Sequence, residues 1–121
     1  MDFLWVGLGA VVGALSRYGI YIALRTFAGR AVPLATLAVN VVGCLAVGAF
    51  VAWSRNLPSP SPNLRLLVVV GFLGSFTTYS AFGLETLEYL RAGQTGRAFA
   101  LVTAHLTLGL GAVWLGLKAF G

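Results

Sequence analysis

The residues best suited to chemistry in this chain lie between Gly71 and Phe82, in the sequence Gly-Phe-Leu-Gly-Ser-Phe-Thr-Thr-Tyr-Ser-Ala-Phe. This segment places glycines, hydroxyl groups and a tyrosine inside an apolar stretch that is otherwise long enough to cross a bilayer. Lipid satisfies neither hydroxyl groups nor free backbone groups, so such a span is tolerated only where it faces protein, water or a bound ion. We therefore expect the functional site here.

Two kinds of ion contact are available in this segment. Tyr79 and Phe82 are three residues apart and project from neighbouring positions on a helix. Ser80 and the hydroxyls of Thr77 and Thr78 are close by. Aromatic rings have a positive edge, which attracts an anion without trapping it. A helix broken near Gly74 exposes carbonyl oxygens, which are the ligands that a small cation prefers. The alternative is a helix kinked by glycine and packed through its aromatic rings.

Polar side chains recur at four-residue spacing in two other apolar stretches. Thr36 and Asn40 share one helix face, and Asn40 brings an amide to the middle of its stretch. Such an amide either lines a polar path or makes an interhelical hydrogen bond that holds the bundle together. Thr103 and Thr107 have the same spacing, although each can instead bond to its own helix.

Three ionisable residues also fall within apolar stretches. Arg17 should either extend to the membrane surface or find an acidic partner, and Glu85 is the candidate of interest. Whether the two side chains meet is open, and both have an interfacial position as the alternative. His105 has no second His or Cys that would complete a metal site. We interpret it as a packed or interhelically bonded histidine, with a role in gating or pH response as the alternative.

Composition assigns the chain to the integral membrane proteins. Of its 121 residues, 59% are hydrophobic and only 9% are charged. The apolar residues gather into four runs of spanning length, over residues 3–24, 31–53, 64–90 and 98–120. We predict an all-α protein whose residues 1–121 form one four-helix transmembrane domain, with the third helix broken in mid-membrane. Hydropathy excludes a soluble enzyme, and no set of nucleophile, base and orienting residue supports catalysis.

The basic residues are scattered between the predicted spans and form no nucleic-acid-binding stripe. With four spans, one side of the membrane holds Arg55, Arg65 and Lys118. The other side holds four arginines, namely Arg25, Arg30, Arg91 and Arg97. Because an excess of Lys and Arg normally fixes orientation, this near balance predicts insertion in both directions and pairing as antiparallel dimers. The alternative is a weak bias that the insertion machinery amplifies.

Three motifs, taken in order along the chain, resemble those of the Fluc (CrcB-type) fluoride channels. They are Gly13-Ala-Leu-Ser-Arg17-Tyr18, Thr36-Leu-Ala-Val-Asn40-Val-Val-Gly43 and the segment from Gly71 to Phe82. The resemblance covers essentially the whole chain. It implies a channel in the inner or plasma membrane that exports fluoride passively from the cytoplasm, as an antiparallel dual-topology homodimer with two pores.

The resemblance also implies roles for individual residues. The fluoride path would be lined by Asn40, Tyr79, Phe82, Ser80, Thr36, Thr103 and Thr107. Gly74 and Thr77 would offer backbone carbonyls to a structural sodium ion at the centre of the dimer. Arg17 would stand near a pore vestibule, and Glu85 beyond the aromatic residues.

The chain departs from the family pattern at four positions. Tyr79 replaces a usual phenylalanine, Ala81 a usual threonine, and Ser75 and Ala35 usual glycines. These changes bear on conduction and coordination more than on the fold, and they leave open a heterodimer encoded by paired genes. The main rival is a small multidrug exporter that couples protons to cation efflux. That class needs a membrane-embedded carboxylate, whereas the first span here carries Arg17 and no acid.

Overall fold

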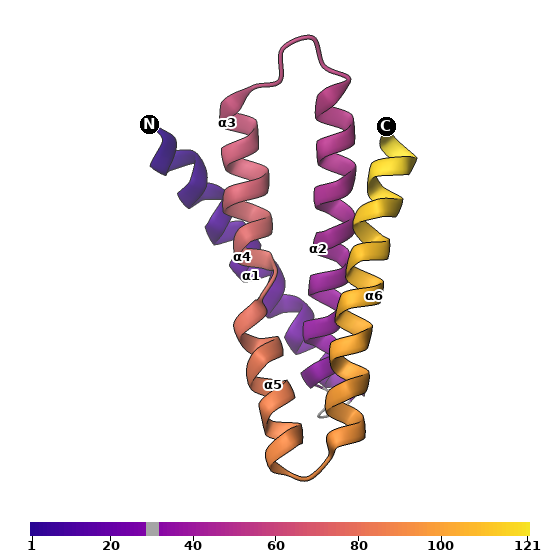
Figure 1. Ribbon diagram of the computed structural model, residues 1–121. Helices are drawn as coiled ribbons and strands as arrows, with labels where there is room; N and C mark the ends of the chain where they lie inside the picture. The colour runs from indigo at the N-terminus through magenta and orange to yellow at the C-terminus, as the bar shows by residue number, and fades with distance from the viewer. Residues whose placement is uncertain (29–31) are drawn as a thin grey trace.

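The computed structural model describes residues 1–28 and 32–121, and their regular structure is entirely helical (Figure 1). The elements are α1 (Asp2–Ala28), α2 (Val32–Arg55), α3 (Pro62–Arg65), η1 (Leu66–Leu73), α4 (Gly74–Phe76), α5 (Tyr79–Arg91) and α6 (Thr95–Phe120). They form four segments long and apolar enough to cross a membrane, Asp2–Phe27, Pro33–Arg55, Pro62–Arg91 and Thr95–Phe120. The predicted all-α, four-span fold is confirmed. Three of the spans are a few residues longer than predicted, and the second keeps its predicted length but lies two residues later in the chain.

Glycines let the helices approach closely in two pairs. In the pair of α1 with η1, a Cβ atom added at Gly9 would collide with the Leu67 carbonyl, and one at Gly71 would meet the Val6 carbonyl. In the pair of α2 with α6, a Cβ atom at Gly48 or Gly116 would strike the backbone of the opposite helix. Close backbone packing of this kind replaces the hydrophobic effect as the main attraction between helices in lipid.

The third span is interrupted between α4 and α5, where the two halves meet at an angle (Figure 1). Thr77 (φ −84°, ψ 160°) and Thr78 (φ −150°, ψ 117°) are extended, whereas Gly74 is helical (φ −61°, ψ −33°). The predicted break in the third span is therefore confirmed, and it lies three residues after Gly74. The extended conformation suits β-branched threonine, so this break requires no glycine.

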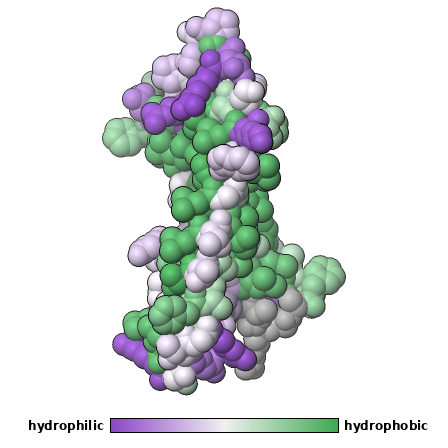
Figure 2. All heavy atoms as spheres, turned by 45° about the vertical axis from the view of Figure 1, so that its right-hand side comes forward, coloured by the Kyte–Doolittle hydropathy of each residue, from purple (hydrophilic) through white to green (hydrophobic). Residues whose placement is uncertain are grey.

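Both chain termini and the connection between α2 and α3 lie at one end of the bundle (Figure 1). The connection between α5 and α6 lies at the other end, as four successive crossings require. On the face that Figure 2 shows, apolar residues and a band of intermediate hydropathy occupy the middle, and hydrophilic residues gather at the two ends. Arg55, Arg65 and Lys118 thus belong to one end and Arg91 to the other. The predicted contribution of Arg30 falls outside the described residues.

Candidate ion site at the helix break

Asn40 holds the break in the third span through both ends of its side-chain amide. Its Nδ2 donates to the Thr78 carbonyl over 2.9 Å, and its Oδ1 accepts from the Thr78 N–H over 2.8 Å. These backbone groups lose helical partners at the break, and Thr78 is only 8% exposed. Buried backbone groups require such replacements. The predicted interhelical hydrogen bond of Asn40 is therefore present, and one N–H of its amide is still available to a ligand.

Thr78 also caps the helix that follows the break. Its Oγ1 accepts from the Ala81 N–H over 3.2 Å and lies 3.2 Å from the Ser80 hydroxyl. This is the usual role of a threonine at a helix N-terminus. An unbroken helix would direct the Thr78 and Ala81 N–H groups to the Gly74 and Thr77 carbonyls. Here they donate instead to Asn40 Oδ1 and to Thr78 Oγ1. Both carbonyls have thus lost the backbone donors of a continuous helix.

Five predicted site residues line one groove of about 450 Å³ beside the break. We call it the ring groove; its lining includes Asn40, Gly74, Thr77, Thr78, Tyr79 and Phe82. The rings of Tyr79 and Phe82 have centroids 5.7 Å apart and planes inclined by 58°. Tyr79 is 82% exposed in the single chain. The structure therefore brings the predicted aromatic residues, amide and carbonyl-bearing residues together on one open face.

A second groove of about 450 Å³ lies between α1 and the start of α5. We call it the arginine groove; its lining includes Arg17, Tyr18, Tyr21, Thr78 and Ser80. Arg17 donates from Nη1 to the Thr77 carbonyl over a long 3.4 Å bond. The guanidinium thus contacts the break itself, and no ion pair with Glu85 is formed among the residues described. Thr78 lines both grooves, so the break separates them.

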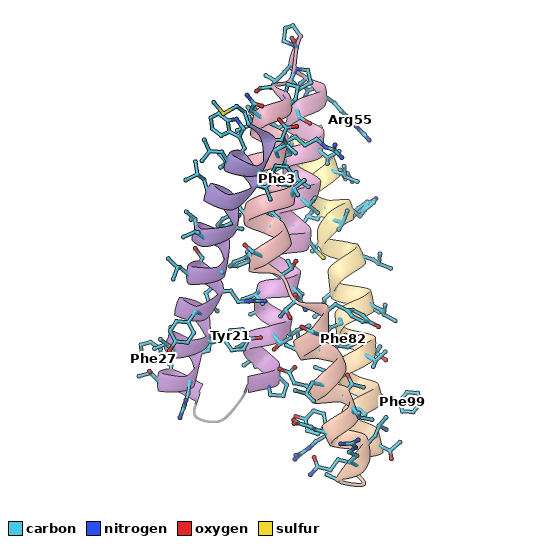
Figure 3. All side chains as sticks on the ribbon, turned by 90° about the vertical axis from the view of Figure 1, so that its left-hand side faces the viewer. Phe3, Tyr21, Phe27, Arg55, Phe82 and Phe99 are labelled. Carbon is cyan, nitrogen blue, oxygen red and sulfur yellow. The ribbon has the colours of Figure 1, made fainter. Side chains whose placement is uncertain are left out.

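A buried hydrogen-bonded chain connects α1, α2 and α5. The Thr36 hydroxyl donates to Glu85 Oε1 over 2.5 Å, and the Tyr21 hydroxyl lies 2.5 Å from Thr36 Oγ1. Because Thr36 gives its proton to Glu85, Tyr21 is the donor to Thr36. Thr36 is 0% and Glu85 7% exposed. Tyr21 extends from α1 into the bundle, and Phe82 lies on α5 (Figure 3).

Three predicted path residues are absent from the lining of both grooves. Thr103 and Thr107 are exposed on α6, and the Thr107 hydroxyl donates to the Thr103 carbonyl over 2.7 Å. For Thr107, the alternative of bonding to its own helix is what the single chain shows. Thr36 is enclosed rather than lining a groove. A role of these three residues in an ion path stays a prediction.

The sequence analysis missed Tyr21, and it noted the Thr78 hydroxyl beside the aromatic residues without its capping role. Tyr21 lies one helical turn after Arg17, and this four-residue spacing places both on the same face of α1. Thr78 comes directly before the helix α5, and threonine is a preferred residue at the N-cap position of a helix. The spacing from Arg17 was the signal for Tyr21, and the N-cap position was the signal for the capping role of Thr78.

Comparison with known proteins gives one consistent result. Residues 4–117 match the model of a family described as CrcB-like protein, Camphor Resistance (CrcB). A fluoride-specific ion channel FluC of Acidobacterium capsulatum is 39% identical over 97% of this chain and 94% of its own length. The protein of the same name in Solibacter usitatus is 40% identical, over 96% of this chain and 95% of its own. That of Nitratidesulfovibrio vulgaris is 42% identical, over 93% and 90%.

Proposed function

Because this chain belongs to the CrcB-like family, we propose that it is a fluoride-selective channel that conducts the ion passively out of the cytoplasm. The observation that carries the proposal is the ring groove, where an amide and two inclined rings meet beside a mid-span break. Relatives named as ion channels also agree with the prediction that the protein is not an enzyme. As a multi-pass protein with four apolar spans, it resides in a membrane.

The groove offers what fluoride needs to leave water. Fluoride is small and strongly hydrated, so it enters only where hydrogen-bond donors and positive dipoles replace its hydration shell. The free N–H of Asn40 supplies one donor, and the edges of Tyr79 and Phe82 supply positive dipoles. A fixed cation in the groove would hold the anion too strongly for conduction. Arg17 lies in the other groove, where its charge attracts anions toward the break.

A second copy of the chain would complete the site. The ring groove is open on one side, and Tyr79 would be unusually exposed in a finished pore. Two antiparallel copies joined across this face would enclose it and give two equivalent paths. The near balance of basic residues at the two ends supports insertion in both directions.

The carbonyls of Gly74 and Thr77 fit a structural sodium ion. Both have lost their backbone donors at the break, and Gly74 is exposed to the ring groove with no side chain to block approach. Arg17 approaches the Thr77 carbonyl, which has a second lone pair free for a cation. Sodium held by these carbonyls in two copies would join the broken helices of the dimer. The role of such an ion would be structural, since a cation offsets the negative ends of carbonyl dipoles.

Fluoride efflux from liposomes tests this function. Vesicles loaded with potassium fluoride and containing the purified protein should release fluoride when valinomycin carries the compensating potassium. Phe82→Ala should reduce the rate at least about tenfold, because it removes a ring from the groove. Phe99→Ala is the matched control, since Phe99 lies exposed on α6 and points away from the bundle (Figure 3). Equal losses in both variants would contradict the assignment of the path.

Cysteine labelling tests the antiparallel dimer. Cys44 is the only cysteine in the sequence, so a Cys44→Ser variant gives a clean background for a Ser59→Cys substitution in the connection between α2 and α3. A membrane-impermeant maleimide should label about half of the copies from outside intact cells and the rest only after permeabilisation. Labelling of all copies from one side would refute dual topology.

A further inference from the structure

A separate cavity of about 280 Å³ lies where α2 runs into its connection with α3, at the end of the bundle that holds both termini (Figure 1). We call it the loop cavity; its lining includes Phe50, Trp53, Leu57, Ser61, Leu64 and Arg65. None of these residues lines the ring groove or the arginine groove. The proposed fluoride path therefore makes no use of this cavity.

The walls of the loop cavity are mainly apolar. Phe50 and Trp53 lie three residues apart on α2, with ring centroids 5.8 Å apart and planes inclined by 52°. Leu57 in the connection and Leu64 in α3 add half-buried aliphatic side chains. Walls of this kind gain free energy when they contact alkyl carbon in place of water.

Arg65 gives this cavity an unpaired positive charge. Its side chain is exposed and forms no hydrogen bond or ion pair within residues 1–28 and 32–121. Arg55 and Lys118 lie at the same end of the bundle, in the last turns of α2 and α6. Two of the three acidic residues of the chain belong to α5, toward the other end, which leaves only Asp2 at this one (Figure 1). The charge at the cavity therefore favours an anionic ligand.

The loop cavity lies at the level where the chain leaves the apolar part of the membrane. One span ends at Arg55 and the next begins at Pro62, and residues on both sides of this connection line the cavity. Trp53 is 43% exposed, and tryptophan favours the headgroup level of a bilayer. The molecules that surround a protein at this level are phospholipids, which carry a phosphate at the surface and alkyl chains directly below it.

We propose that the loop cavity binds an anionic phospholipid, whose phosphate pairs with Arg65 and whose first alkyl segments lie against Trp53 and Leu64. A guanidinium binds phosphate through two parallel hydrogen bonds, so arginine suits this group well. The volume of about 280 Å³ is close to the lower end of the roughly 300–1,000 Å³ of small-ligand sites, so it fits a headgroup and not a whole lipid. The inference goes beyond the proposed fluoride function and does not depend on it.

The apolar walls distinguish a lipid from a free phosphate ion. Inorganic phosphate gains nothing from contact with Phe50, Trp53 or Leu64, whereas burial of alkyl carbon against them is favourable. An anionic headgroup is favoured over a zwitterionic one, because Arg55 and Lys118 add positive potential at this end. In the proposed antiparallel dimer, each leaflet of the membrane would meet one such cavity.

Quenching of Trp53 by a brominated lipid tests this site. Trp5→Phe and Trp114→Phe together leave Trp53 as the only tryptophan of the full-length chain. In phosphatidylcholine nanodiscs that contain a minor fraction of phosphatidylglycerol with brominated chains, Trp53 should be quenched well beyond that fraction. Brominated phosphatidylcholine at the same fraction should quench it only in proportion. Equal quenching by the two lipids would overturn the proposal, because the cavity would then not select an anionic headgroup.

Two arginine variants give the matched comparison. Arg65→Gln should need at least about tenfold more brominated phosphatidylglycerol for the same quenching, because it loses the paired hydrogen bonds to phosphate. Arg55→Gln removes the same charge outside the cavity lining, where Arg55 extends away from the bundle (Figure 3), so it should shift the curve by only about twofold. Equal shifts would refute the site, because the lipid would then respond to the charge of the whole end.

Arg65→Lys guards against a folding defect, although Arg65 is exposed and its variants should elute and melt like the wild-type protein. Lysine keeps the charge and loses the bidentate geometry, so its quenching curve should fall between those of Arg65→Gln and wild type.

Inorganic phosphate is the last arm of the test. An excess of it should leave the quenching of Trp53 unchanged, whereas recovery of the fluorescence would show a site for free anions and overturn the assignment to a lipid. No fluoride flux enters these measurements, so their result stands whether or not the protein conducts fluoride.

Discussion

Replacing Asn40 with alanine should destabilise the protein as well as stop conduction. The substitution removes both the donor to the Thr78 carbonyl (2.9 Å) and the acceptor for its N–H (2.8 Å). Thr78 is nearly buried, so water cannot replace these partners. A buried polar group left without a hydrogen-bond partner lowers the free energy of unfolding by about 1–3 kcal/mol. The N–H and the carbonyl of Thr78 together therefore give about 2–6 kcal/mol.

The loss is measurable as a change in thermal stability. In a chain of this length 1 kcal/mol corresponds to about 4 °C, so Asn40→Ala should lower the melting temperature by about 8–24 °C. Tryptophan fluorescence in detergent follows the transition, since the chain has three tryptophans. Asn40→Asp keeps the acceptor and loses the donor, so it should fall between Asn40→Ala and wild type in stability while abolishing flux through its charge.

Asn63→Ala is the matched control for this series. Asn63 is exposed in the short helix α3, far from the break, so its truncation should leave the melting temperature within about 2 °C of wild type. If Asn40→Ala melts like the wild-type protein while flux is lost, Asn40 contacts the ion but does not hold the break. That result would refute the reasoning from hydrogen bonds.

Three further substitutions probe other parts of the structure. Gly9→Ala should lower the melting temperature because its Cβ would collide with the Leu67 carbonyl, whereas Gly7→Ala should be neutral because nothing lies within 4 Å. Thr36→Val should cost about 1–3 kcal/mol of unfolding free energy by removing the donor to Glu85, and the exposed Thr26→Val should cost little. Tyr79→Phe should conduct within a fewfold of wild type and Tyr79→Ala should not, because the ring edge and not the hydroxyl contacts the anion. The first two are measured by thermal or denaturant unfolding and the third by fluoride efflux.

The sequence predicted the spans well because membrane helices are defined by length and apolarity, and both are local properties. It also predicted that Tyr79 and Phe82 would lie side by side, because residues three apart on one helix are neighbours on its surface. The position of the break could not be predicted in the same way. Glycine is the usual signal, but the extended residues are Thr77 and Thr78, and what stabilises them is Asn40 on another helix.

The buried contacts of the site were beyond prediction for a similar reason. The sequence suggests that Arg17 seeks an acidic partner, yet its guanidinium contacts the Thr77 carbonyl, which only the break makes accessible. Glu85 instead accepts from Thr36, and Tyr21 joins them from α1. Such partnerships depend on how helices rotate against one another. Between α1 and η1, close contacts at Gly9 and Gly71 belong to this packing.

The most direct measurement of the central claim is the ratio of fluoride to chloride efflux from the same protein-containing vesicles. If ring edges and neutral donors replace the hydration shell of a small anion at the break, fluoride should leave at least about a hundredfold faster than chloride. Equal rates for the two anions, in vesicles where Phe82→Ala still stops the flux, would contradict the proposed basis of selectivity.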